Sequence, residues 1–171
     1  MGDPKALAAL SLALLCALGS AGCAYLPESM ERPFRKPGER LSEFPEQVSA
    51  EYNCANQKLP WFKLEKFEVW PKHLEAGQEL GNRLVYALCT ANPTAVVTGT
   101  LETRIIYRGE AVKRDTDAKY DLRPGRWVVD VMVAVPPTAP TGLYALELEF
   151  KGGGVKFSQS ETFAVDAAPA K

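Results

Sequence analysis

The sequence contains a single histidine, His73, among its 171 residues. General acid–base catalysis uses histidine more than any other side chain, and a catalytic base needs a nucleophile or an orienting carboxylate within hydrogen-bond reach. His73 lies between a predicted strand and a turn at Gly77, and the sequence places no such partner beside it. The serines after residue 50, Ser158 and Ser160, lie outside any nucleophile-elbow pattern. We therefore expect His73 to be a loop residue and the protein not to be an enzyme.

The chain also lacks an excess of charge of either sign. Its 20 Lys and Arg residues are balanced by 21 Asp and Glu residues, which gives a formal net charge of −1. Nucleic-acid binding depends on clustered Lys and Arg side chains that neutralise phosphates. No nucleic-acid partner is therefore expected.

Acidic residues are densest at Asp115, Asp117 and Asp121. A calcium loop of the EF-hand type is not indicated, because Lys119 occupies a ligand position and Tyr120 stands where glycine is required. We expect a solvated loop that holds no metal. Glycines 152–154 precede neither a helix nor a Lys-Ser or Lys-Thr pair, so they indicate a hairpin tip and not a phosphate-binding loop. No cofactor is expected.

No apolar run is long enough for a permanent transmembrane helix, which needs about 20 residues. The run at residues 6–18 has the position and character of the hydrophobic region of a signal peptide. Directly after it, Ser20-Ala21-Gly22 precedes Cys23. This arrangement resembles the lipobox of bacterial lipoproteins, although Ser20 stands where leucine is usual in that family.

The resemblance implies that the signal peptide, residues 1–22, is removed and that the thiol of Cys23 is acylated. Two or three acyl chains would anchor the protein to a membrane, because each buried methylene contributes about 0.8 kcal/mol. Ala24 is not the acidic residue that retains such lipoproteins at the inner membrane, so the resemblance implies the outer membrane of a bacterial cell envelope. An ordinary secretory signal, cleaved near Cys23, is the alternative.

The remaining cysteines predict a disulfide. Of four cysteines, Cys16 leaves with the signal peptide and Cys23 carries lipid, so Cys54 and Cys89 remain in a compartment where disulfides persist. They lie 35 residues apart (89 − 54 = 35). A bridge over this loop is worth about 4 kcal/mol in the chain-entropy model. A metal site made from these two cysteines would need histidine, and only His73 is present.

Residues 23–50 are rich in proline and in charges of alternating sign. Such a segment buries too little apolar surface to offset the entropy of ordering it. We expect a lipidated N-terminus and flexible tether over residues 23–50, a β-sandwich domain over 51–166 and a disordered tail over 167–171.

Apolar residues within the predicted domain recur with the period of two that is typical of strands. The clearest alternation runs through residues 142–150, and after glycines 152–154 a second alternating segment completes an antiparallel hairpin. Residues 127–135 are apolar on both faces apart from Asp130, which indicates a central strand. Further strands are predicted at residues 62–70, 84–88, 97–107 and 111–114.

The first predicted strand changes phase, because Phe62 and Leu64 alternate together whereas Phe67 and Val69 lie in the opposite phase. A β-bulge between the two pairs would absorb this slip. About seven short strands and no helical stripe predict an all-β sandwich.

Residues 136–146 resemble the corner between strands E and F of immunoglobulin-like domains, where a Gly-x-Tyr sequence places a tyrosine whose hydroxyl bonds to nearby backbone. Gly142 and Tyr144 match this pattern, and Leu146 stands where antibody domains carry a cysteine. The resemblance spans about residues 59–165. It implies an immunoglobulin-like antiparallel β-sandwich, as in many domains of the bacterial envelope.

The strand phases also place the disulfide. If Leu84, Tyr86 and Leu88 face the core, Cys89 points to the outer surface of the same sheet. Residues 52–57 must then cross that outer surface, where Cys54 holds them.

Trp61, Phe62 and Trp70 lie among lysines. Aromatic rings flanked by cations suit a platform for a glycan ring or an anchor for a partner peptide. The alternative is that the three rings pack against the domain, which is the usual fate of large aromatics.

These observations predict a membrane-anchored lipoprotein whose immunoglobulin-like domain acts as a non-enzymatic protein-binding or assembly module in the envelope. Its partner would be another envelope protein, contacted through a sheet edge or exposed loops. One alternative is a carbohydrate-binding module that uses the region of Trp61 and Trp70. Another is a protease inhibitor that presents a loop such as residues 135–142, or an uncharacterised enzyme.

Overall fold

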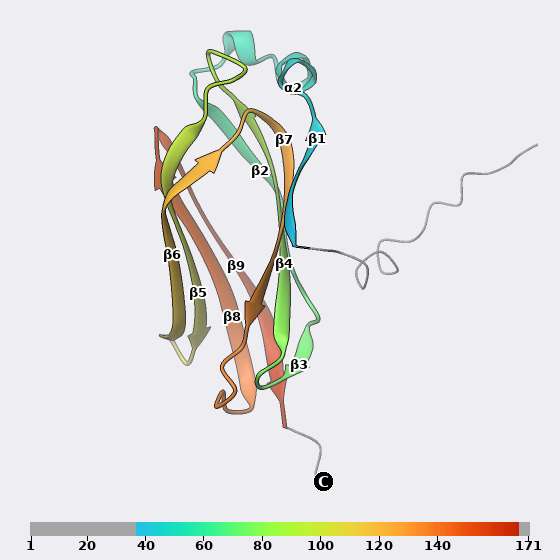
Figure 1. The fold of residues 1–171 in the computed structure, drawn as a ribbon, viewed down its shortest axis with the longest axis vertical. Helices are drawn as coiled ribbons and strands as arrows, with labels where there is room; N and C mark the ends of the chain where they lie inside the picture. The colour runs from blue at the N-terminus through green and yellow to red at the C-terminus, as the bar shows by residue number, and fades with distance from the viewer. Residues whose placement is uncertain (1–36, 168–171) are drawn as a thin grey trace, which may run out of the picture. The chain divides into compact units, whose positions relative to one another are not determined.

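Alternating apolar residues build two β-sheets that pack face to face (Figure 1). The structure is a computed structural model and describes residues 37–167. The predicted signal peptide, Cys23 and the last four residues of the predicted tail lie outside these residues. The described part contains nine strands and two short helical segments: β1 Gly38–Glu43, α2 Pro45–Glu51, η2 Cys54–Asn56, β2 Trp61–Trp70, β3 His73–Glu75, β4 Glu79–Cys89, β5 Val97–Tyr107, β6 Glu110–Leu122, β7 Gly125–Ala134, β8 Gly142–Gly152 and β9 Val155–Asp166.

The order of the strands follows the immunoglobulin scheme. One sheet has the order β1-β7-β4-β2 and the other β3-β9-β8-β5-β6. Strands β2, β4 and β7 take the places of A, B and E, and β5, β8 and β9 those of C, F and G. Strand β1, which precedes all of these in the chain, occupies the place of strand D beside β7. The predicted all-β sandwich is confirmed, with nine described strands where about seven were expected.

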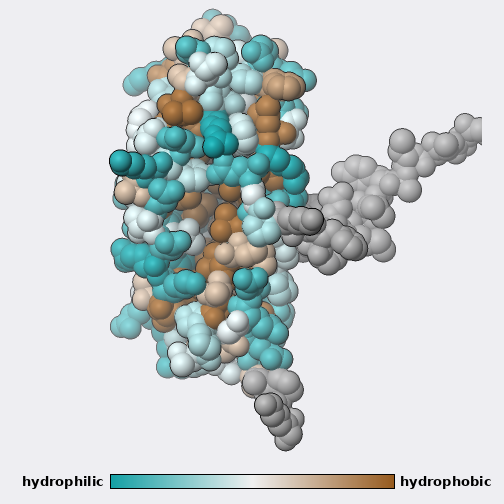
Figure 2. Space-filling model, viewed as in Figure 1, coloured by the Kyte–Doolittle hydropathy of each residue, from teal (hydrophilic) through white to brown (hydrophobic). Residues whose placement is uncertain are grey.

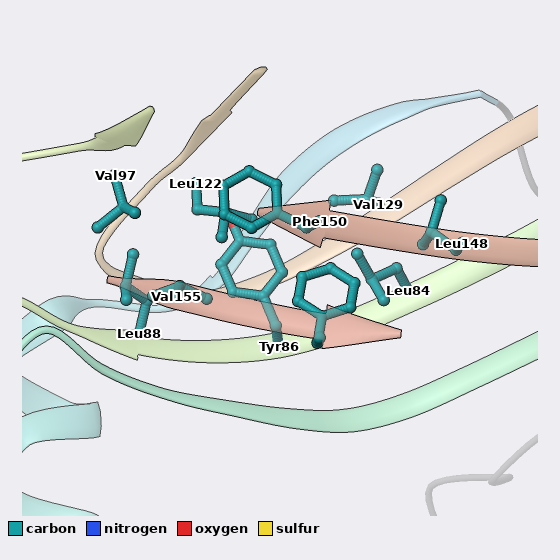
Figure 3. Close-up of a cluster of buried hydrophobic side chains, with 10 residues drawn as sticks. Leu84, Tyr86, Leu88, Val97, Leu122, Val129, Leu148, Phe150 and Val155 are labelled. Carbon is teal, nitrogen blue, oxygen red and sulfur yellow. The ribbon is translucent and has the colours of Figure 1, made fainter. Parts of the chain in front are cut away.

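Aromatic and aliphatic side chains from both sheets meet in the interior. Figure 3 shows Tyr86 of β4 and Phe150 of β8 lying between the sheets, with Leu84, Leu148 and Val155 around them. All five are at most 5% exposed. The inward phase predicted for residues 84, 86 and 88 is therefore confirmed.

Tyr144 forms the predicted corner. Its hydroxyl donates to the carbonyl oxygen of Pro140 at 2.7 Å, and its side chain is 2% exposed. Burial raises the pKa of Tyr144, so the hydroxyl stays protonated and can donate. The hydrogen bond ties the segment between β7 and β8 to the start of β8.

The predicted β-bulge in the first strand is also confirmed. The register of β2 against β4 shifts between Leu64 and Lys66, with Glu65 as the extra residue. The shift lets Phe62 and Val69, which are in opposite phases, both face the interior. After β2 the chain crosses at Pro71 to the other sheet, where β3 pairs in parallel with β9.

The segment predicted as a flexible tether differs from the structure over residues 38–50. Strand β1 pairs with β7 from Gly38 to Glu43, and helix α2 buries Val48 completely on the outer face of that sheet. Residues 38–43 are mostly polar and show no apolar alternation, so their sequence did not predict a strand paired with β7. Residues 23–36 of the predicted tether lie outside the described part.

The disulfide is present between Cys54 and Cys89, with Cα atoms 6.2 Å apart. As predicted, Cys89 faces outward from β4 and residues 52–57 cross the outer face of the sheet. There the two cysteines pack with Val48 and Ala87 in a small cluster separate from the main core. The cluster attaches α2 and η2 to the sheet, at the upper end of Figure 1.

Candidate functional site

The three aromatics predicted as a contact surface lie apart in the structure. Phe62 is part of the core, stacked on Phe157 with ring centroids 4.9 Å apart. Trp61 packs against Tyr52 at 4.7 Å, beside the disulfide cluster. Trp70 lies at the other end of β2, where its ring covers Gly81. Nine residues of strand separate Trp70 from Trp61, which corresponds to roughly 30 Å at about 3.3 Å per residue. The three rings therefore form no common platform for a glycan.

His73 is on strand β3 and not in a loop as predicted. Its Nδ1 atom lies 3.3 Å from a carboxylate oxygen of Asp166, and both side chains are exposed. Ser160 is on β9, four residues before Ala164, the residue that pairs with His73. Four residues of strand span about 13 Å, so Ser160 lies outside hydrogen-bond reach of His73.

Within residues 37–167 no group of three or more His, Cys, Asp and Glu side chains is placed to hold a metal ion. The helices of the same range are too short or too polar to cross a membrane.

The segment between β7 and β8, considered as an inhibitor loop, is held against the domain. Val135 is buried, Ala139 packs on the core, and Pro140 accepts the hydrogen bond from Tyr144.

A hollow of about 470 Å³ lies between α2 and the segment after β4. Proline and alanine side chains form much of its wall, with Glu46 as its one charged residue: Pro45, Glu46, Ser49, Ala50, Leu88, Cys89, Thr90, Ala91, Pro93 and Pro124. This lining offers few directed polar groups for recognition.

A more distinctive hollow opens between β6 and β7, where the two sheets separate. Figure 2 shows apolar surface inside a depression on this face, flanked by polar surface on both sides. Two adjoining cavities form the depression, of about 170 Å³ and about 100 Å³. Thr103, Asp115 and Val131 line both of them. We call this depression the β6–β7 groove.

The wall formed by β7 includes an unpaired stretch of strand. Strand β1 pairs with β7 only as far as Asp130, so among the described strands none lies beside residues 131–134 on that side. The N–H of Val135 donates to Gln78 toward β4, and peptide groups alternate in direction along a strand. Met132 and Ala134 therefore direct their N–H and C=O groups to the free edge.

The prediction of a central strand at residues 127–135 is thus only partly correct. Residues 126–130 are central, with β1 on one side and β4 on the other. Beyond Asp130 the strand has become an edge, although Val131, Met132 and Val133 are apolar in sequence. Val131 is 42% exposed.

The wall formed by β6 carries the acidic residues that were predicted to lie in a solvated loop. They belong instead to the outermost strand of the five-stranded sheet, and Asp115 and Asp117 line the groove. The loop prediction was wrong because an edge strand with exposed side chains shows no apolar alternation. Asp121, at the end of the same strand, accepts a hydrogen bond from the hydroxyl of Thr98.

Two hydrogen bonds bridge the groove, one toward each end. Lys113 of β6 donates to the carbonyl oxygen of Ala134 at 2.8 Å, and Tyr120 of β6 donates to a carboxylate oxygen of Glu39 at 2.8 Å. Burial and the neighbouring Glu39 raise the pKa of Tyr120, so its hydroxyl stays protonated. The groove is open between these two bridges.

Polar groups inside the groove have spare hydrogen-bonding capacity. Asp115 and Asp117 accept hydrogen bonds from the nearby backbone N–H groups of Thr116 and Lys119, and within residues 37–167 neither has an ion pair. Asn82, 3% exposed, donates to the carbonyl oxygen of Val131, and in the same range its Oδ1 accepts no hydrogen bond. The groove therefore joins an apolar floor to acceptors that suit a donor or a cation.

No protein-family model and no curated protein matches the chain. Among solved structures it is similar to the sporulation control protein Spo0M from Bacillus subtilis, at 12% identity and a TM-score of 0.44, over 63% of this chain and 50% of that one. It is also similar to the alkylpurine DNA glycosylase AlkC of Pseudomonas fluorescens, at 12% identity and a TM-score of 0.44, over 70% and 34%. A family 123 glycoside hydrolase from Clostridium perfringens gives 12% identity and a TM-score of 0.43, over 75% and 27%. The chain spans half or less of each of these proteins, and the likenesses carry no argument about function.

Proposed function

We propose that this protein is a membrane-anchored lipoprotein whose immunoglobulin-like domain acts as a non-enzymatic protein-binding or assembly module in the bacterial cell envelope. The observation that carries the proposal is the edge of β7 at residues 131–134, beside which no strand of residues 37–167 lies, directly next to the apolar β6–β7 groove. An unpaired edge offers backbone donors and acceptors to a partner strand, and the groove offers pockets for its side chains.

The proposed location rests on the sequence. The lipobox resemblance around Cys23 supports a lipid anchor in the outer membrane, and the disulfide between Cys54 and Cys89 is in keeping with an oxidising compartment. The partner would be another protein of the envelope.

Crosslinking in the native cell tests this function. A photoreactive amino acid is placed at Met132, on the free edge, and in a matched protein at Lys156, an exposed position on β9. We expect one abundant envelope protein to be captured from position 132 and not from position 156. Equal background from both positions would contradict a partner at this edge.

The anchor is tested in the same cells with Cys23→Ser. We expect this protein to leave the membrane fraction and to lose incorporation of a labelled fatty acid. A protein that stays in the membrane and keeps its label would contradict lipidation at Cys23.

A further inference from the structure

We propose that the β6–β7 groove accepts an extended segment of the partner protein as an additional strand on β7, with an apolar and a basic side chain two residues apart entering the groove. This inference rests on the proposed function and adds the chemistry of the partner.

The position that a partner strand would occupy beside β7 continues the line of β1. Strand β1 occupies the place beside β7 from Glu43, opposite Arg126, to Gly38, opposite Asp130. The next four residues of β7 extend about 13 Å further without a neighbour among the described strands. A partner strand in line with β1 would pair with the N–H and C=O groups of Met132 and Ala134.

Alternate side chains of a partner strand can enter the two adjoining cavities of the groove. Residues that stand directly opposite in a β ladder point to the same face, so partner residues opposite Val131 and Val133 face the groove. These two partner residues lie two positions apart, about 6.6 Å along the strand. The cavities adjoin through Thr103, Asp115 and Val131, so one strand can place one side chain in each.

The two cavities differ in the chemistry of the residues that line them. The larger has an apolar floor, which suits an aliphatic side chain: Leu84, Leu101, Val129, Val131 and Leu148. The smaller is bordered by Lys113, which bonds to Ala134, and by Asp115, a carboxylate that lines both cavities and has no ion pair among the described residues. A Lys or Arg on the partner would form a charge-assisted hydrogen bond with it.

In the free protein, Lys113 forms a hydrogen bond with the exposed edge of β7. Its ammonium group occupies the carbonyl of Ala134, one of the acceptors that a partner strand needs. Lysine at an exposed edge also opposes pairing between copies of the same protein. A partner strand must therefore displace Lys113, so removing this side chain is expected to strengthen binding.

The test measures peptide binding to the purified full chain by fluorescence anisotropy. The probe is a fluorescein-labelled, end-capped peptide of sequence TTKTLTT. A strand in line with β1 runs antiparallel to β7, so Lys stands opposite Val133 and Leu opposite Val131. We expect TTETLTT to bind about tenfold more weakly because its glutamate meets Asp115. TTKPLTT should also bind more weakly, since proline removes a backbone donor.

Variants of the protein complete the test. Asp115→Asn should weaken TTKTLTT about fivefold and leave TTETLTT unchanged or stronger, whereas the matched control Glu110→Gln, at the exposed hairpin of the same strand, should change neither. Lys113→Ala should strengthen TTKTLTT severalfold. Absence of binding by TTKTLTT, or equal binding of the Lys and Glu peptides, would overturn the proposal.

The failure of this inference is distinguishable from the failure of the proposed function. A partner crosslinked from position 132 whose yield is unaffected by Asp115→Lys would keep the protein-binding function and reject the basic strand. Peptide binding with the expected charge dependence, but with nothing captured in cells, would support the chemistry of the groove and reject the envelope partner. Self-association of the chain that TTKTLTT inhibits would assign the edge to a second copy and overturn the proposal.

Discussion

Arg126 holds three separate segments on strand β7. Its guanidinium forms ion pairs with Glu43 at the end of β1, Glu51 at the end of α2 and Glu65 at the bulge of β2. The Arg126 side chain is 14% exposed, so solvent screens these pairs only in part. The hydroxyl of Tyr52 also hydrogen-bonds to Glu65. One residue thus couples the N-terminal segment to the sandwich.

We expect Arg126→Gln to lower the free energy of unfolding by about 2 kcal/mol at pH 7, because it removes charge-assisted hydrogen bonds from partly buried carboxylates. The hydrogen bond with Arg126 lowers the pKa of Glu51 below its ordinary value of 4.5. A depressed carboxylate pKa stabilises the fold above the unfolded-state value and loses this effect as the pH falls. Urea unfolding should therefore show a smaller difference between the variant and the wild type at pH 3.5 than at pH 7. A difference independent of pH would show that the effect comes from packing alone.

The hydroxyl of Tyr144 provides a second prediction for a single group. Tyr144→Phe removes the donor to the carbonyl of Pro140 and keeps the buried ring, so we expect a loss of about 1 kcal/mol. Tyr107→Phe is the matched control, because Tyr107 stacks on Tyr144 and its ring would be kept. Thermal unfolding of both proteins measures the difference. Equal melting temperatures for the two variants would count against a stabilising role for the corner.

At the scale of elements, the disulfide joins the short segment η2 to strand β4. It closes a loop of 35 residues that contains β2, β3 and most of β4. The bridge lies under α2, beside Val48 and Trp61. It therefore stabilises both the domain as a whole and the local cover on the outer face of the sheet.

We expect Cys54→Ala combined with Cys89→Ala to lower the free energy of unfolding by about 3–4 kcal/mol, since the open chain gains conformational entropy when unfolded. Urea unfolding with and without dithiothreitol measures this. The reductant should lower the stability of the wild type and leave the double variant unchanged. A wild type insensitive to dithiothreitol under unfolding conditions would contradict the prediction.

At the scale of the whole molecule, the domain begins before the boundary that composition indicates. Strand β1 completes the four-stranded sheet and α2 covers its outer face. Among the described strands, none pairs with residues 131–134 on that side of β7, so β1 both stabilises the sandwich and defines one end of the proposed binding edge.

Two shortened chains test this boundary. A chain that starts at Glu51 should unfold with a free energy lower by about 3 kcal/mol or more than a chain that starts at Pro37, because it loses the burial of Val48 and the pairing of β1. Denaturant titration of both chains provides the measurement. Equal stability would mean that residues 37–50 act only as a tether.

The sequence by itself determined the features that depend on neighbouring residues. Period-two alternation at residues 142–150 identified β8 and its inward face, and the phase change between Leu64 and Phe67 located the bulge of β2. The outward position of Cys89 followed from the same alternation. These predictions succeeded because side-chain direction in a strand is a local property that a buried face makes visible.

Only the tertiary structure decided which strands are central and which form edges. The polar β1 and β6 are strands because their backbones pair with β7 and β5, and no side-chain pattern records that pairing. Strand β7 changes from central to edge at Asp130 because its neighbour β1, about ninety residues earlier in the chain, begins at Gly38, opposite that residue. Backbone hydrogen bonds between distant segments are nearly independent of residue type, so their partners are set by the folded arrangement of the whole chain.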